Sequence, residues 1–213
     1  MEKAGFKVYG YRWVMLLVFM LVVAINQLMW ITFAAITGDA ARYYGVSDLR
    51  IGLLSMIFMI VYIVVSIPAS WAIDTYGLRA AVGIGAALTG AFGLLRGLVA
   101  SSYTWVLIAQ IGIAVGQPFI QNAVTTVAAR WFPMQERATA AGLASLAMYL
   151  GIVVGLALTP ILTLRSGIAG MLVAYGIVSA ISAAVFFDFG PRFLGSAPST
   201  FSAFPFSESK HLL

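Results

Sequence analysis

The residues of this sequence that could do chemistry are amides and aromatics inside long apolar segments. Asn26 and Gln27 interrupt the apolar run AINQLMWITF, and Trp30 follows Asn26 by one helical turn on the same face. In another apolar segment, Gln117 and Gln121 are four residues apart and also share a face. An aromatic wall attracts an organic cation by about 0.5–2 kcal/mol without a carboxylate. Together Asn26, Trp30, Gln117 and Gln121 predict a binding site for a small organic cation.

Each of these mid-segment amides could instead hold neighbouring helices together. A hydrogen bond between transmembrane helices contributes about 0.6–2 kcal/mol, and Gln121 or Asn122 taken singly fits that role equally well. Trp30 could belong to an interfacial aromatic belt, but it lies only ~7 Å past the middle of its segment, which is too deep. Two segments that are both polar at mid-depth favour a water-filled cavity.

The apolar segments have no acid or base at mid-depth. Asp74, Arg96 and Asp188 lie at segment ends, and the single histidine is His211 near the C-terminus. Nucleophilic catalysis needs a base beside the nucleophile, a zinc site needs His or Cys, and proton coupling needs an ionisable group in the membrane. We therefore expect no enzyme activity, no metal, no cofactor and no proton coupling. The net charge of +5 comes from residues that flank apolar segments, so we expect no nucleic-acid partner.

The composition identifies lipid as the solvent of these segments. Hydrophobic residues make up 62% of the 213 residues and charged residues 9%, against about 25% charged in soluble domains. A span needs about 20 apolar residues and must be helical to satisfy its backbone. We predict an all-α polytopic membrane protein with six transmembrane helices. The expected spans are about 12–37, 51–73, 80–99, 104–129, 138–161 and 168–188.

The expected organisation is one bundle, residues 1–188, followed by a tail. The tail, 189–213, is rich in Pro, Ser and Phe and is predicted to be disordered. An excess of Lys and Arg on one side predicts that both termini are cytoplasmic, in a plasma or cytoplasmic membrane. The first and fourth spans both carry mid-span amides, as two inverted three-helix repeats would.

A loop signature follows the second span. The segment SWAIDTYGLR resembles the major facilitator superfamily signature G-x-x-x-D-[RK]-x-G-x-[RK] at Asp74, Gly77 and Arg79, with Ser70 and Thr75 as departures. Gly77 permits a tight turn. Asp74 is expected to face a cationic group at the inner gate, with Arg130 as its candidate partner.

Three longer segments resemble the feline leukaemia virus subgroup C receptor family: YRWVMLLVFMLVVAINQLMW, IGLLSMIFMIVYIVVSIPASWAIDTYGLR and VGQPFIQNAVTTVAARWFP. The resemblance implies facilitative transport of choline and ethanolamine, with haem export also ascribed to members. It implies a cation site at Asn26, Trp30 and Gln117, with Phe58 and Tyr62 as neighbours.

That family has twelve spans, whereas six are predicted here. The chain is therefore expected to be half of a transporter, either a fragment or short isoform that lacks a C-terminal six-helix half, or a protein that pairs as a homodimer. Two alternatives stay open. One is a haem exporter-like transporter, for which the spans offer only methionines as axial ligands. The other is a non-transporting assembly or regulatory module.

Overall fold

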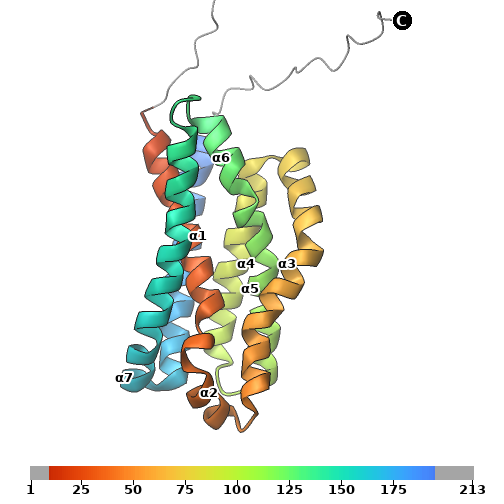
Figure 1. The fold of residues 1–213 in the computed structure, drawn as a ribbon, viewed down its shortest axis with the longest axis vertical. Helices are drawn as coiled ribbons and strands as arrows, with labels where there is room; N and C mark the ends of the chain where they lie inside the picture. Colours follow the sequence, from red (N-terminus) through yellow and green to blue (C-terminus); the bar gives the residue numbers. More distant parts are fainter. Residues whose placement is uncertain (1–9, 195–213) are drawn as a thin grey trace, which may run out of the picture.

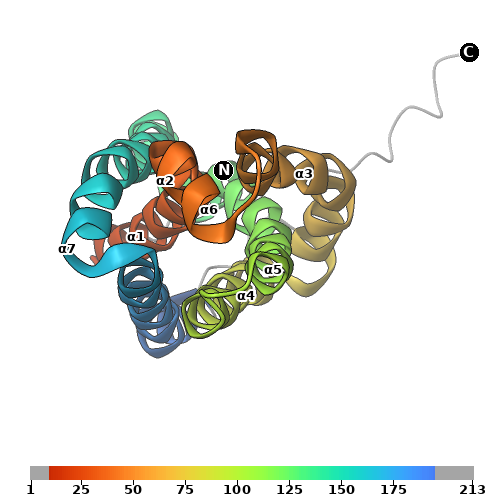
Figure 2. The ribbon, with the colours of Figure 1, turned by 90° about the horizontal axis from the view of Figure 1, so that it is seen from below.

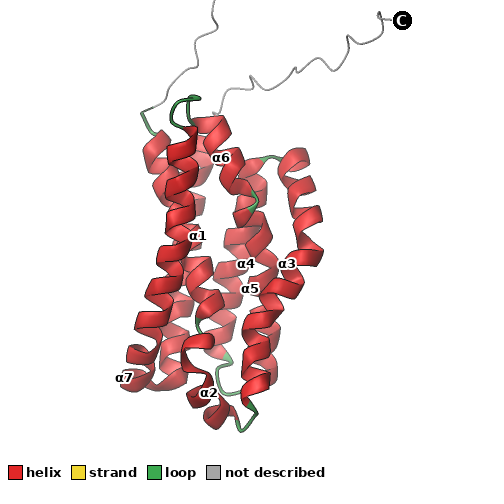
Figure 3. Cartoon of the chain, in the orientation of Figure 1, coloured by secondary structure: helices red, strands yellow, loops and turns green. Residues whose placement is uncertain are grey.

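The chain folds into a bundle of long helices that run along one axis (Figure 1). The computed structural model describes residues 10–194, and all regular structure in that range is helical (Figure 3). The elements are α1 Arg12–Ile31, the 3₁₀ turn η1 Ala34–Ile36, α2 Thr37–Tyr44, α3 Asp48–Tyr76, α4 Leu78–Leu98, α5 Tyr103–Gln121, α6 Ala123–Trp131 and α7 Arg137–Leu194.

Five helical stretches of the described residues are long and apolar enough to cross a membrane. The last of them contains the fifth and sixth predicted spans, since α7 is interrupted at Gly167 (φ 70°, ψ 174°). The chain reverses there, and the two parts of α7 run back along each other (Figure 1). The hydroxyls of Thr159 and Tyr175 are 3.0 Å apart across these two parts. Positive φ at this reversal explains the glycine.

Two of the predicted spans are broken helices. The first consists of α1 and α2, and Thr32 and Thr37 at the break donate hydroxyl hydrogen bonds to Leu28 and Phe33 carbonyls, which favours a bend. The fourth consists of α5 and α6. Pro118 lacks an N–H donor in the last turn of α5, and the chain breaks at Asn122, between the two helices.

The helices pack with α1 and α5 at the centre. In the end view, α3 and the first part of α7 lie on opposite sides of the bundle (Figure 2). Helix α7 packs against α1 and α4, while α5 packs against α3 and α4. Gly151 of α7 lies so close to the backbone of Ala24 in α1 that a Cβ atom would not fit there. Small residues that permit such close approach are typical of membrane helix pairs.

One end of the bundle is fastened by a charged pair. Both guanidinium Nε and Nη2 of Arg12 donate to the carboxylate of Glu136, at 3.1 and 3.0 Å. This joins the start of α1 to the loop between α6 and α7. The predicted tail starts at residue 189, but α7 continues to Leu194, and 195–213 lies outside the described residues.

Candidate functional site

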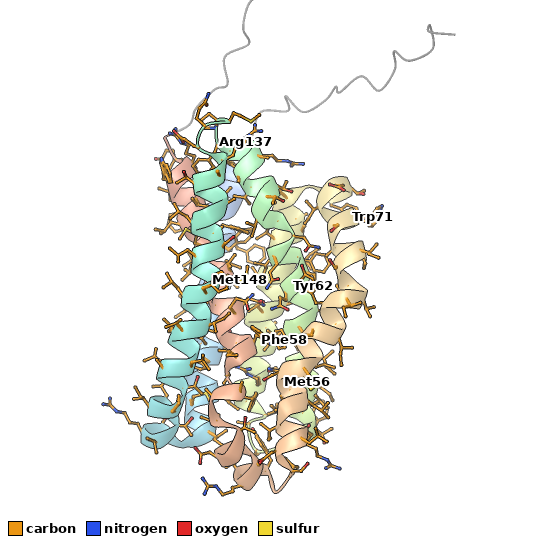
Figure 4. The ribbon with its side chains drawn as sticks, viewed as in Figure 1. Met56, Phe58, Tyr62, Trp71, Arg137 and Met148 are labelled. Carbon is orange, nitrogen blue, oxygen red and sulfur yellow. The ribbon has the colours of Figure 1, made fainter. Side chains whose placement is uncertain are left out.

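A cavity of about 460 Å³ lies between α1, α3, α5 and the first part of α7. Its size falls within the usual 300–1,000 Å³ of small-molecule sites. Figure 4 shows Phe58 and Tyr62 on α3 and Met148 on α7 at mid-height of the bundle. The lining residues are Gln27, Trp30, Phe58, Met59, Tyr62, Ile63, Gln117, Gln121, Met148, Tyr149 and Ile152.

The aromatic side of the cavity is fixed by hydrogen bonds to neighbouring helices. The indole Nε1 of Trp30 donates to the carbonyl oxygen of Ser55 in α3, at 3.0 Å. The hydroxyl of Tyr62 donates to the side-chain oxygen of Asn122, at 2.8 Å. Both polar groups are thereby engaged, and both side chains line the cavity. Phe58 is almost fully buried beside them.

The polar part of the lining consists of Gln27, Gln117 and Gln121. Within residues 10–194, none of these three amides makes a side-chain hydrogen bond, even though Gln27 and Gln117 are buried. Buried amides are normally paired with protein or ordered water. Three free amides around one cavity are therefore available to a ligand or to water.

The other two mid-span amides hold helices together. Asn26 is fully buried and donates to the hydroxyl of Thr89 in α4, at 3.0 Å. The amide nitrogen of Asn122 donates to the carbonyl of Ser66 and to the hydroxyls of Ser66 and Ser70 in α3, at 2.9–3.1 Å. Asn26 thus lies outside the cavity lining, in contrast to its predicted place beside Trp30. Gln27, which was not among the predicted site residues, lies there instead, because positions three and four residues before Trp30 both neighbour it on a helix.

The predicted loop residues lie at the junction of α3 and α4. Gly77 has φ 86°, a conformation that glycine adopts without strain. Asp74, Arg79 and Arg130 are exposed. In the described part of the chain no ion pair joins Asp74 to Arg130, so the structure lacks the expected contact. The role of these residues in a gate stays a prediction.

Arg96 is the polar residue whose position the sequence predicts least well. Its place near the end of a span suggests an outward-facing charge, yet the side chain is fully buried. It donates to the carbonyl of Met29 and to the side-chain oxygen of Gln110, at 3.1 and 2.7 Å. One feature of the sequence could have indicated that Arg96 is buried: the residues around it, including the neighbouring Gly97, are apolar or small.

Apolar helices long enough to cross a membrane, with a cavity at mid-height between them, are typical of an integral membrane transporter. The model of the Major Facilitator Superfamily matches residues 8–212, so the chain belongs to this superfamily.

Relatives agree with this assignment. Solute carrier family 49 member A3 of Danio rerio is 35% identical over 188 residues, which cover 84% of this chain and 40% of the relative. Choline/ethanolamine transporter FLVCR1 of Mus musculus is 38% identical over 154 residues, which cover 71% of this chain and 27% of the relative. The chain spans less than half the length of these relatives.

A solved structure shares the fold. It is that of a bacterial homologue of the human lysosomal transporter Spinster, in an inward-facing and unoccupied conformation. The TM-score is 0.75 at 20% identity, and the match covers 85% of this chain and 43% of the other. At that identity the likeness concerns the fold alone.

Proposed function

We propose that this chain forms one half of a facilitative transporter for a small organic cation of the choline or ethanolamine class. The observation that carries the proposal is the mid-height cavity, in which Trp30 and Tyr62 stand beside the unpaired amides of Gln27, Gln117 and Gln121. A quaternary ammonium group has no N–H donor, so an aromatic wall suits it better than hydrogen-bond acceptors do. The amides offer partners for a hydroxyl group or a bridging water.

The neutral lining favours facilitated transport over proton coupling. None of the described residues that line the cavity is acidic, basic or a histidine. Transport would then be driven by the gradient and charge of the substrate itself. The name of the relative FLVCR1, a choline/ethanolamine transporter, supports the same substrate class.

The half-transporter part of the proposal rests on the incomplete enclosure of the cavity. Its two sides are formed by α3 and the first part of α7, which carry exposed apolar residues beside the lining, such as Met56, Ile60 and Val153. A second six-helix half, or a second copy of this chain, would close this face and rock against the first half around the mid-height site. Both termini would lie in the cytoplasm, as the distribution of basic residues predicts.

Removal of the indole tests the proposal. Trp30→Ala should abolish choline uptake into proteoliposomes that contain this chain with its completing half, and Trp30→Phe should retain part of it, because a phenyl ring keeps a weaker cation–π contact. Binding of radiolabelled choline to the purified chain provides the same comparison without the second half.

The matched control is Trp105→Ala, since Trp105 is an exposed tryptophan outside the lining. It should leave binding unchanged. Equal choline binding by the wild type and Trp30→Ala would refute the assignment.

A haem exporter-like transporter is the alternative substrate class. Met59 and Met148 in the lining are potential axial ligands, but no basic side chain of the described lining could pair with the propionates.

A non-transporting assembly module is the alternative role for this chain. It predicts that the purified chain binds neither choline nor haem.

A further inference from the structure

Arg96 is a buried cation that no carboxylate neutralises within residues 10–194. Its Nη1 donates to the carbonyl of Met29 in α1 at 3.1 Å and to the side-chain oxygen of Gln110 in α5 at 2.7 Å. Its Nη2 lies 3.2 Å from the sulfur of Met29, and the guanidinium lies 5.6 Å from the ring centroid of Phe33. Neutral acceptors and an aromatic face therefore surround the charge.

The break in the first span explains why a cation is stable here. Helix α1 ends at Ile31, so Met29 belongs to its last turn. Carbonyls in the last turn lack partners inside the helix and carry the negative end of its dipole. Arg96 provides the donor for one of them, and Thr32 donates to the carbonyl of Leu28 in the same turn.

Gln110 extends the contact to a third partner helix. While its oxygen accepts from Arg96, its amide nitrogen donates to the carbonyl of Leu54 in α3, at 3.1 Å. Arg96 and Gln110 thus connect the backbone of α1 at Met29 with the backbone of α3 at Leu54. Charge-assisted bonds to a planar guanidinium fix geometry more strictly than neutral ones do.

The two anchored residues directly precede the hydrogen-bonded pair Trp30 and Ser55, of which Trp30 lines the cavity. Met29 is followed by Trp30, and Leu54 is followed by Ser55, whose carbonyl accepts the indole N–H at 3.0 Å. Two links therefore join α1 to α3 at adjacent positions, one through Arg96 and Gln110 and one through the indole. A shift of either backbone would change the direction of the Trp30 ring.

We propose that Arg96 and Gln110 are positioning residues that hold Trp30 in place as the cation-binding wall. This inference rests on the proposed function for its significance, although the structural effect on Trp30 can be measured without any substrate.

The test uses 5-fluorotryptophan and fluorine NMR on the purified chain. The sequence has five tryptophans, and the signal of Trp30 is assigned as the one missing in Trp30→Phe. In Arg96→Met, which keeps a long apolar side chain but no donor, we expect a shift or broadening of the Trp30 signal while the signals of Trp71 and Trp105 stay in place. Arg96→Lys should give a smaller change, because an ammonium keeps the charge without the planar fork. Choline affinity should fall at least about tenfold in Arg96→Met, equivalent to about 1.4 kcal/mol, because the Trp30 ring is no longer held in its binding orientation.

The matched control is Arg12→Met, the same substitution at an arginine that is bonded to Glu136 at one end of the bundle and makes no contact with Met29 or Gln110. It should leave the Trp30 signal unchanged. A folded Arg96→Met protein with an unaltered Trp30 signal would overturn the proposal. The proposal would also be overturned if all five tryptophan signals collapsed in Arg96→Met, Arg96→Lys and Gln110→Met alike. That result would show that Arg96 and Gln110 support the fold as a whole and not the position of Trp30. If the Trp30 signal changes in Arg96→Met but the wild-type chain binds no choline, the positioning role of Arg96 is supported and the proposed substrate is refuted.

Discussion

Among the five amides at mid-depth, hydrogen bonding separates two roles. Asn26 and Asn122 donate to residues of other helices, as structural amides in membranes do. Gln27, Gln117 and Gln121 have no such partner in the described chain and border the cavity. Sequence spacing identified Trp30, Gln117 and Gln121 as a set, but it selected Asn26 as the fourth member, whereas Gln27 lines the cavity. Both are helical neighbours of Trp30, and only packing against Thr89 of α4 distinguishes them.

This separation gives a paired prediction at the residue scale. Gln117→Leu should weaken choline binding about tenfold, the value of one hydrogen bond of roughly 1.4 kcal/mol, with little change in thermal stability. Asn26→Leu should instead destabilise the fold by about 0.6–2 kcal/mol through the lost bond to Thr89. Equilibrium binding and thermal unfolding in detergent check both. A Gln117→Leu protein that melts early and binds normally would reverse the assigned roles.

At the scale of elements, apolar run length predicted where helices lie, but did not predict their interruptions. At the break after Ile31, the hydroxyls of Thr32 and Thr37 bond to carbonyls four residues earlier. Such local bonds also occur in unbroken helices, so the threonines alone do not predict the break. Burial of Arg96 escaped prediction for a different reason: its acceptors, Met29 and Gln110, are on other helices and meet it only in the folded bundle. By contrast, the turn signature correctly placed a glycine with positive φ at residue 77.

The reversal inside α7 leads to a prediction about glycine. Gly167 has φ 70° and ψ 174°, a combination that is essentially restricted to glycine. Gly167→Ala should lower the free energy of unfolding by about 1–3 kcal/mol. Gly142→Ala, at an uncrowded position in the helical first part of α7, should have no effect or stabilise by up to ~1 kcal/mol. Equal melting temperatures for the two variants would contradict the assigned strain.

For the whole molecule, the chain spans less than half the length of the matching relatives, and its cavity is partly open. Helix α3 and the first part of α7 both carry exposed apolar residues, and the two helices lie on opposite sides of the bundle (Figure 2). A second copy related by a twofold axis would place α3 of one copy against α7 of the other. Such pairing would enclose two equivalent cation walls.

Cysteine crosslinking tests this pairing, because the chain has no cysteine of its own. Chains with Ile63→Cys and chains with Val153→Cys, co-expressed in one membrane, should form disulfide-linked dimers upon oxidation. Ile177→Cys provides the control, since Ile177 is exposed on the second part of α7 and should not crosslink to Ile63→Cys. Monomers in both mixtures would show that the chain does not pair in this way, and would leave a separate six-helix half as the completing partner.

The bond between the indole of Trp30 and the carbonyl of Ser55 also limits how selective this wall can be. With its only donor already engaged, the indole offers an incoming molecule nothing but π electrons. It responds to the size and positive potential of an ammonium head, and is indifferent to what the rest of the molecule carries. Discrimination between alcohols, amines and plain tetraalkylammonium ions therefore has to come from the glutamine side of the cavity.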